Sequence, residues 1–282
     1  MKWLVFGSNG WIGSMCVELL ESQDEEVIRA KSRADDDKLV REELIRVNPD
    51  RVLCLVGRTH GEGIPTIDYL ENPDKLVENV KDNLYAPVHL ALQCNKLGIH
   101  MTYLGTGCIF TYQDNSPENG YTEDDVPDFF GSNYSIVKGF TDRLFHHMPV
   151  LNIRIRMPII GEAHERNFIT KIVGYEKVVN IPNSMTVLPE LLPLMIDMAK
   201  NKVVDTVNLT NPGPVTHNEV LGLYKKHIDP EYTWKNFTEQ EQNEILKSKR
   251  SNNTLNTNKL VQMYPNVKNI HDSIEHELKG KL

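Results

Sequence analysis

Short apolar runs alternate with longer helix-like segments through the first half of the chain. The longer segments predict helices at residues 11–22, 36–48, about 74–96 and about 132–147. The runs between them are apolar without alternation, which predicts buried strands at residues 2–7, 25–30, 51–57, 100–107 and 150–159. Such strands, separated by helices, are typical of a parallel sheet covered on both faces. The pattern therefore predicts an α/β fold with a Rossmann-type doubly wound parallel sheet.

The second half of the chain is less regular. Residues 189–201 look helical, residues 205–211 predict a further strand, and prolines interrupt the rest. We expect a cofactor-binding domain at residues 1–160, with 186–212 added to it. A smaller C-terminal substrate-binding lobe would take residues 161–185 and 213–282. Two such parts leave a cleft at the carboxyl ends of the strands, where open α/β sheets bind ligands.

Composition and net charge argue against some classes of binding partner. The net charge of −8 over 282 residues argues against a nucleic acid or an anionic membrane. No apolar run approaches the roughly 20 residues of a membrane span, and the N-terminal run is too short for a signal-peptide core. Neither the histidines nor the cysteines have metal-type spacing; the cysteines are Cys16, Cys54, Cys94 and Cys108. We expect a cytoplasmic protein with reduced thiols and no metal site.

The first predicted strand runs into the glycine-rich turn "GSNGWIG". Gly7, Gly10 and Gly13 permit a tight turn and a close approach of the backbone, and the helix that follows offers free N–H groups to a pyrophosphate. In this strand–turn–helix context the motif predicts a dinucleotide site. The further residues that we assign to this site are Asn9, Trp11, Ile12, Val56 and Gly57.

The end of the second strand indicates which dinucleotide binds. An acidic residue there holds a ribose 2′-hydroxyl, whereas an arginine accommodates a 2′-phosphate. The run "RAKSRADDD" puts Ser32 and Arg33 at this position, before the acidic residues begin. We therefore predict NADPH. Two alternatives stay open, namely that these side chains form a solvated edge and that Asp35 turns back toward a ribose.

A catalytic set follows from two further segments. "YSIVK" puts Tyr134 and Lys138 four residues apart on one helix face, where the ammonium would lower the pKa of the phenol. Thr106 ends a predicted strand. Together they predict a carbonyl-reducing site, in which Thr106 hydrogen-bonds the carbonyl, Tyr134 protonates its oxygen and Lys138 holds the ribose.

With these motifs, the chain resembles the extended short-chain dehydrogenase/reductase family. "RSNNTLNTNKL" resembles a segment of dTDP-4-dehydrorhamnose reductases. "TGCIF", "RMPI", "RNFITKI" and "NPGPVTHNEV" resemble the bifunctional UDP-4-keto-6-deoxyglucose 3,5-epimerase/4-reductases of plants, and this similarity spans essentially the whole chain. The resemblance implies the last steps of UDP-L-rhamnose synthesis from a UDP-4-keto-6-deoxy sugar, and a homodimer.

The resemblance also implies roles for residues outside the reductase set. Cys108 lies two residues after Thr106, so it faces the same side, and family members with epimerase activity carry a Cys base and a Lys or His acid at such places. Lys171 is the expected acid and Lys177 its competitor. Without an epimerase role, Cys108 would be a small buried filler and Lys171 a solvated side chain. The expected substrate contacts are Thr106, Asn167, Phe168 and, at the diphosphate, Arg250.

Two other functions remain open, a reductase without epimerase activity and a non-catalytic NADP-binding regulatory subunit. The chain also departs from its relatives in two places. Cys54, Leu55 and Val56 stand where Asn-Ala-Ala is common, and the loop at residues 60–75 looks longer than usual. We expect neither departure to touch the catalytic set.

Overall fold

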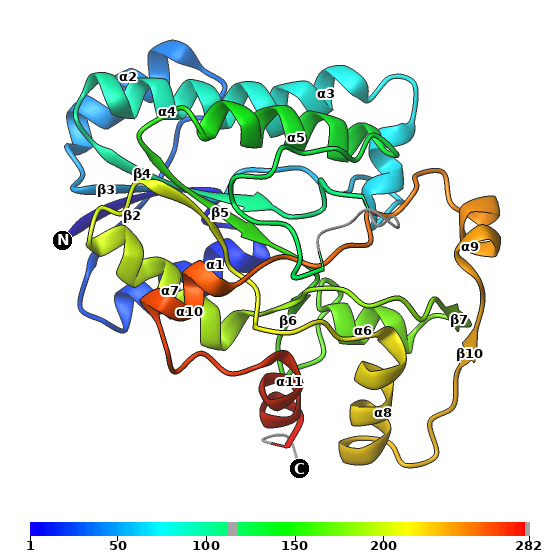
Figure 1. Ribbon diagram of the computed structural model, residues 1–282. Helices are drawn as coiled ribbons and strands as arrows, with labels where there is room; N and C mark the ends of the chain where they lie inside the picture. The colour runs from blue at the N-terminus through cyan, green and yellow to red at the C-terminus, as the bar shows by residue number, and fades with distance from the viewer. Residues whose placement is uncertain (112–117, 280–282) are drawn as a thin grey trace.

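The computed structural model describes residues 1–111 and 118–279 and confirms the predicted α/β fold with a parallel sheet (Figure 1). Six parallel strands lie side by side in the order β2-β1-β3-β4-β5-β9. The chain leaves β1 toward one edge and resumes at β3 on its other side, so the ligand-binding switch point lies between β1 and β3. The strands are β1 (Lys2–Phe6), β2 (Glu26–Arg29), β3 (Arg51–Cys54), β4 (His100–Thr106), β5 (Val150–Ile155) and β9 (Asp205–Asn208).

Helices cover both faces of this sheet, as Figure 1 shows. Two separate hydrophobic cores, one on each face, explain why the strands are apolar throughout. The helices of one face are α2 (Asp37–Val47), α3 (Leu76–Val80), α4 (Ala86–Lys96) and α5 (Asn133–Phe145). Those of the other face are α1 (Trp11–Glu21), α7 (Leu188–Lys200) and α10 (Asn258–Met263).

The long helix predicted at residues 74–96 is interrupted in the structure. Between α3 and α4 the chain makes a π-helical turn at Lys81–Tyr85. The turn buries Asn83, whose side chain accepts from the Arg58 amide and donates to the Arg58 carbonyl, both at 2.9 Å. The π-turn therefore fixes the start of the loop after β3, which borders the ligand end of the sheet.

A smaller lobe packs below the sheet around its own core, which includes Ile159, Ile172, Val220 and Ile274. A 3₁₀ turn at Ile67–Glu71 lies in the loop after β3. The short strands of the molecule are β6 (Pro158–Ile159), β7 (Lys177–Val178), β8 (Thr186–Val187) and β10 (Lys235–Asn236). The helices of the lobe and its tail are α6 (Phe168–Val173), α8 (His217–His227), α9 (Glu239–Ile245) and α11 (Ile270–Lys279).

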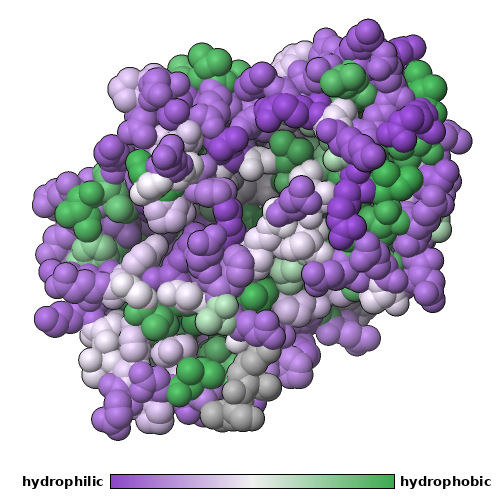
Figure 2. Space-filling view, turned by 180° about the vertical axis from the view of Figure 1, so that it is seen from behind, coloured by the Kyte–Doolittle hydropathy of each residue, from purple (hydrophilic) through white to green (hydrophobic). Residues whose placement is uncertain are grey.

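The chain crosses between the two parts more often than predicted. Helix α7 and strand β9 lie in the sheet domain, and α10 does too, because Leu260 is buried in the core shared with α1 and α7. The predicted lobe at 213–282, of which 280–282 lie outside the described residues, is therefore interrupted by a return to the sheet. Figure 2 shows a mostly hydrophilic rear face with scattered hydrophobic residues. No helix within residues 1–111 and 118–279 is long and apolar enough to cross a membrane.

Candidate active site

The glycine turn after β1 has the geometry of a dinucleotide cradle. Gly7 has φ +81°, and a Cβ atom there would lie 2.7 Å from the Leu55 carbonyl oxygen. A Cβ at Gly13 would lie 2.1 Å from the Gly7 oxygen, so no larger residue fits either position. Helix α1 begins after Gly10 with no side-chain cap, which leaves its first N–H groups available to a diphosphate. The residues present thus fit a bound dinucleotide.

The other residues assigned to the cofactor lie around this turn. Asn9 is exposed and Ile12 half-buried. The Trp11 ring stacks on His164 of the lobe, with centroids 4.8 Å apart, so the turn lies between the two parts of the molecule. Across the switch point, Val56 packs on the core beneath α4, and Gly57 lies against Asn83 of the π-turn.

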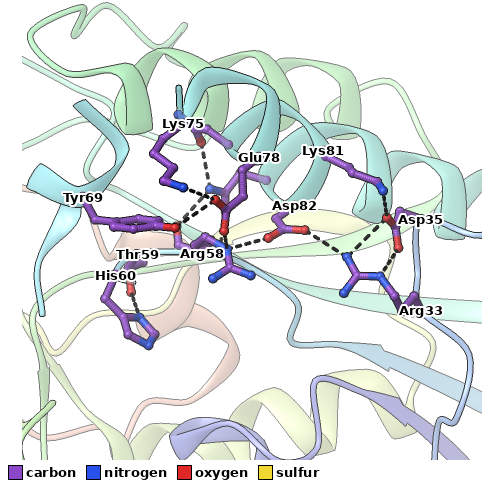
Figure 3. A network of polar contacts seen from close by, with 12 residues as sticks. Arg33, Asp35, Arg58, Thr59, His60, Tyr69, Lys75, Glu78, Lys81 and Asp82 are labelled. Atoms are coloured by element: carbon purple, nitrogen blue, oxygen red, sulfur yellow. Dashed lines mark hydrogen bonds and ion pairs between the residues drawn. The ribbon is translucent and has the colours of Figure 1, made fainter. Parts of the chain in front are cut away.

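The end of β2 carries a chain of ion pairs, drawn in Figure 3. Arg33, with 68% of its side chain exposed, bonds Asp35 at 2.9 Å and lies 3.6 Å from Asp82. Lys81 holds Asp35 from the other side at 2.7 Å. Asp35 therefore already has two cationic partners, while the Arg33 guanidinium faces solvent. The network continues from Asp82 to Arg58 at 2.6 Å.

Ser32, the second residue assigned to the 2′-phosphate, has a partner inside the protein. Its hydroxyl donates to the Glu43 carboxylate at 2.7 Å, and its backbone amide donates to the same carboxylate at 2.8 Å. These bonds fix the backbone that carries Arg33. A contact between Ser32 and the cofactor stays a prediction.

Thr106, Tyr134 and Lys138 come together at the carboxyl end of β4. Ser132 caps α5, which sets the direction of the turn that carries Tyr134. Burial raises the pKa of Tyr134, and a hydrogen bond with Thr106 only partly opposes this. Lys138 donates to the Tyr103 hydroxyl, and burial lowers its pKa to about 8. The prediction that Lys138 lowers the pKa of the Tyr134 phenol is therefore wrong for this structure: burial raises that pKa, and the ammonium is directed to Tyr103 instead.

Cys108 lies beside Thr106 and Tyr134. Its backbone amide donates to the Thr106 hydroxyl at 3.1 Å, and its side chain packs in a small cluster with Tyr134 and Tyr69. It is partly exposed, whereas the other cysteines are buried. Burial raises the pKa of Cys16 and Cys54 to about 12 each, as expected of inert core thiols.

The long loop does touch the catalytic set, contrary to prediction. Tyr69 and Leu70 of its 3₁₀ turn pack on Tyr134 and Cys108. Glu71 accepts from the Asn133 amide at the start of α5 at 2.8 Å. This loop therefore forms one wall of the pocket and supports the helix that carries the tyrosine.

The two candidate lysines have different surroundings. Lys171 is partly buried on α6, where burial and the nearby Arg166 guanidinium lower its pKa. Lys177 is exposed at the start of β7. A lowered pKa suits an amine that gives up a proton, so the environment favours Lys171 over Lys177.

The predicted substrate contacts lie in the lobe and the C-terminal tail. Asn167 is buried, caps α6 and donates to the Ile160 and Glu162 carbonyls, so its side chain is used within the protein. Phe168 packs edge-on against His217 at 5.2 Å. Arg250 forms an ion pair at 2.7 Å with Asp68 of the long loop, which joins the tail to the sheet domain. Contacts of these residues with a substrate stay predictions.

A model of the NAD dependent epimerase/dehydratase family matches residues 3–154, across β1 to β5 and the assembled site. The chain belongs to this family. It is 40% identical over 97% of its length to a bifunctional dTDP-4-dehydrorhamnose 3,5-epimerase/reductase of Arabidopsis thaliana, of which it covers 91%. It also resembles the crystal structure of a UDP-rhamnose synthase from Acanthamoeba polyphaga mimivirus, with 55% identity, TM-score 0.97 and 99% of each chain covered.

The fold extends to more distant structures. A dTDP-4-dehydrorhamnose reductase of Clostridium acetobutylicum superimposes with TM-score 0.82 over 98% of each chain at 17% identity, a likeness of fold alone. Four residues at the site were not identified from the sequence pattern. These are Tyr103, which binds Lys138; Asn83, which holds the Arg58 loop; Arg166, beside Lys171; and Arg156, buried behind Cys108. A buried polar residue in an apolar strand or helix was the available signal for the first two.

Proposed function

We propose that this protein converts UDP-4-keto-6-deoxy-D-glucose to UDP-L-rhamnose by 3,5-epimerisation and NADPH-dependent reduction of the 4-keto group. The observation that carries the proposal is the position of Cys108 beside Thr106 and Tyr134, in a chain that aligns end to end with relatives named for both activities. A reductase alone needs no thiol there. A binding subunit needs neither the thiol nor the tyrosine.

In the reduction, the hydroxyls of Thr106 and Tyr134 hydrogen-bond the 4-keto oxygen of the sugar. Tyr134 gives its proton to that oxygen, Lys138 holds the ribose of the cofactor, and the phenolate then regains a proton from water. NADPH, when bound, supplies the hydride for the 4-keto carbon. The burial that raises the pKa of Tyr134 keeps the phenol protonated until the 4-keto oxygen of the sugar becomes basic.

In the epimerisation, the 4-keto group acidifies the C–H bonds at C3 and C5. The Cys108 thiolate removes a proton from one face, the electron pair moves to the keto oxygen, and Thr106 and Tyr134 stabilise the enolate through hydrogen bonds. Lys171 delivers a proton to the opposite face, which inverts the carbon. The thiol then loses its proton to water and Lys171 regains one from water, so the same enolate chemistry can serve the second carbon.

Electrostatics supports the finer assignments of cofactor and substrate. The exposed guanidinium of Arg33 suits a 2′-phosphate, while Asp35 is held by Arg33 and Lys81, which favours NADPH over NADH. Arg250 lies within electrostatic range of Lys171, so the diphosphate of UDP would meet cations on this side of the pocket.

The molecular surface supports a homodimer. Apolar side chains gather around the outer face of α5, where Phe130, Phe140 and Leu144 are exposed, and Val77 on α3 is 78% exposed. A cavity on this surface is lined by Pro127, Phe129, Phe130 and Phe140, among others. Exposed apolar patches of this kind mark association surfaces. The four free cysteines are in keeping with a cytoplasmic location.

Cys108→Ala tests the proposal, because it removes the base and leaves Thr106, Tyr134 and Lys138 in place. In heavy water, with the un-epimerised 4-keto sugar nucleotide and no NADPH, wild type should incorporate deuterium at C3 and C5 and the variant should not. Given NADPH and an already epimerised substrate, the variant should still oxidise the cofactor. Cys94→Ala, in the core beneath α4, is the matched control and should keep both activities.

The outcomes separate the three candidate functions. Exchange at the wild-type rate in Cys108→Ala would show that the thiol is only core filler. A wild-type protein that reduces substrate without exchange is a reductase alone, and one that does neither is a binding subunit. Lys171→Ala should lose exchange as Cys108→Ala does, and it should retain part of it if water replaces the amine.

A further inference from the structure

Arg156 is a buried cation beside the pocket that the proposed reaction does not yet use. It follows β5, and only 1% of its surface is exposed. Its guanidinium donates to the carbonyls of Gly107 at 2.9 Å, Ser251 at 2.8 Å and Ser184 at 3.3 Å, and to the side-chain oxygen of Asn183. All of these acceptors are neutral. Within residues 1–111 and 118–279, no carboxylate forms an ion pair with it.

The neighbouring arginine shows what the more usual arrangement looks like. Arg154, two residues earlier and equally buried, makes a two-point ion pair with Asp142 at 2.7 and 2.9 Å. A guanidinium that is buried without an anion is costly, because its lost hydration is not repaid by a charge of opposite sign. An anion that forms nearby during the reaction would therefore meet a positive charge that no carboxylate neutralises.

The acceptors of Arg156 show where that anion would form. Gly107, whose carbonyl it binds, directly precedes Cys108. Asn253 donates to the same carbonyl at 2.9 Å and to the Phe110 carbonyl at 3.2 Å. Arg156 and the tail residue Asn253 therefore clamp both sides of Cys108, and the loop cannot turn the thiol away from Thr106 without breaking these bonds.

The charge of Arg156 also reaches the thiol. Burial lowers the pKa of Arg156, and its electrostatic interaction with Cys108 opposes that lowering. Tyr134 and Lys138 on α5 also interact electrostatically with Cys108. Lys138 directs its ammonium to the Tyr103 hydroxyl, and Arg156 has no such competing role in the proposed reduction.

We infer that Arg156 is the positioning residue of the epimerase base: it fixes the loop of Cys108 and supplies the buried positive charge that stabilises the thiolate. The inference rests on the proposed epimerase role of Cys108. When Cys108 takes a proton from C3 or C5, the negative charge moves from sulfur to the keto oxygen. When the thiol returns its proton to water, Arg156 again faces an anion.

The test compares Arg156→Gln, which removes the charge, with Arg156→Lys, which keeps it. The first readout is the rate of Cys108 alkylation by iodoacetamide at pH 7, followed by mass spectrometry of its peptide. Arg156→Gln should slow alkylation about tenfold or more, because a nearby opposite charge changes the ionised fraction of an acid by about 10- to 1,000-fold. Arg156→Lys should recover part of the rate. Arg51→Gln is the control, since Arg51 is also buried against carbonyls but at the far end of β3.

The second readout is activity. Deuterium exchange at C3 and C5 should fall with the alkylation rate in Arg156→Gln, while NADPH oxidation with an epimerised substrate should change by less than about threefold. If Arg156 only braced the loop, its loss would expose the thiol and alkylation would be faster or unchanged, which would overturn the inference. Should Arg156→Gln not fold, Asn253→Ala removes the second donor to Gly107 and keeps the charge, and slow alkylation there would equally overturn it.

The results distinguish a failure of the proposed epimerase role of Cys108 from a failure of the role inferred for Arg156. Alkylation reports the ionisation of Cys108 whether or not the thiol acts on a sugar. Slow alkylation in Arg156→Gln together with wild-type exchange in Cys108→Ala would refute the epimerase role and with it the inference. Normal alkylation in Arg156→Gln with lost exchange in Cys108→Ala would refute the role of Arg156 alone.

Discussion

Lys138 should lower the stability of the folded protein although it is needed for reduction. Lys138→Met should therefore yield a more stable protein that no longer reduces substrate. The ammonium is 4% exposed and its hydrogen-bond acceptor is the neutral hydroxyl of Tyr103. Burial lowers its pKa from 10.5 to about 8. At pH 7 the lysine is nevertheless protonated, so the folded protein contains a buried charge that water would solvate better.

The magnitude follows from that pKa. Each unit corresponds to about 1.36 kcal/mol, so the lowering from 10.5 to about 8 costs the fold about 3 kcal/mol at pH 7. Methionine keeps the apolar stem and removes the charge, but it leaves the Tyr103 hydroxyl without a donor, which costs about 1–2 kcal/mol. We expect Lys138→Met to raise the free energy of unfolding by about 1–2 kcal/mol.

The pH dependence of stability independently tests whether the buried Lys138 charge is destabilising. Between pH 8 and 10.5 the unfolded chain binds a proton at this lysine that the folded protein has lost, so wild-type stability should rise with pH from about 8. Above about pH 10 the rise should reverse, because Tyr134 and Tyr103 have raised pKa values and ionise first in the unfolded chain. Lys138→Met should lack the rise and keep the reversal.

Urea unfolding at pH 7, 8 and 9.5 without added cofactor measures these differences. Lys96→Met, at an exposed lysine on α4, is the matched control and should stay within about 0.5 kcal/mol of wild type. Reduction by Lys138→Met should fall by at least about 100-fold, because the cofactor ribose loses the ammonium that positions it and small misplacements of reacting groups cost about that much. A variant less stable than wild type at pH 7, or wild-type stability that is flat from pH 8 to 9.5, would refute the argument.

Three further predictions concern single side chains. Tyr134→Phe should retain NADPH binding and lose about 10²–10⁴-fold in reduction, measured by stopped-flow absorbance, since only the proton donor is removed; turnover within a few-fold of wild type would mean that another group is the acid. Arg33→Ala should raise the KM for NADPH about 10- to 100-fold, as expected for a lost charge-assisted bond to a 2′-phosphate, and leave the KM for NADH nearly unchanged; equal effects on both cofactors would contradict the assignment. Burial lowers the pKa of His217 from 6.5 to about 4, so the unfolded chain binds a proton first as pH falls through that range and stability should decline by about 3 kcal/mol; His217→Leu should flatten this part of the urea-unfolding profile, and an unchanged slope would exclude His217 as its source.

Local spacing explains what could be predicted from the sequence. The glycine turn depends on three residues within one strand–helix junction, and Tyr134 and Lys138 share a face because of helix periodicity alone. Parallel strands then bring Thr106 to the same edge of the sheet as the glycine turn. Each of these features is set by neighbours in the chain, so the fold and the centre of the site follow from the pattern.

The parts that could not be predicted depend on contacts between distant segments. Tyr103 looked like one more apolar strand residue, and only the packing of α5 on β4 makes it the acceptor of Lys138. The π-turn is hard to see in the sequence, because one extra residue shifts the apolar positions by one place and a broad apolar helix face tolerates that shift. The long loop looked peripheral, yet Tyr69 closes the pocket and Asp68 holds Arg250, 182 positions later.

The C-terminal tail explains why a sequence string outside the sheet accompanies this chemistry. In "RSNN", Arg250 binds the long loop through Asp68, while Ser251 and Asn253 both donate to the Phe110 carbonyl, at 2.6 and 3.2 Å. The tail thus bonds to both segments that flank the thiol, and Arg156 bonds to the tail at Ser251. Because the same segment also resembles one in dTDP-4-dehydrorhamnose reductases, these bonds support the reductase site as well as the thiol. A base that must reach C3 and C5 in turn needs a loop that does not move, and the tail supplies bonds that hold the Cys108 loop in place.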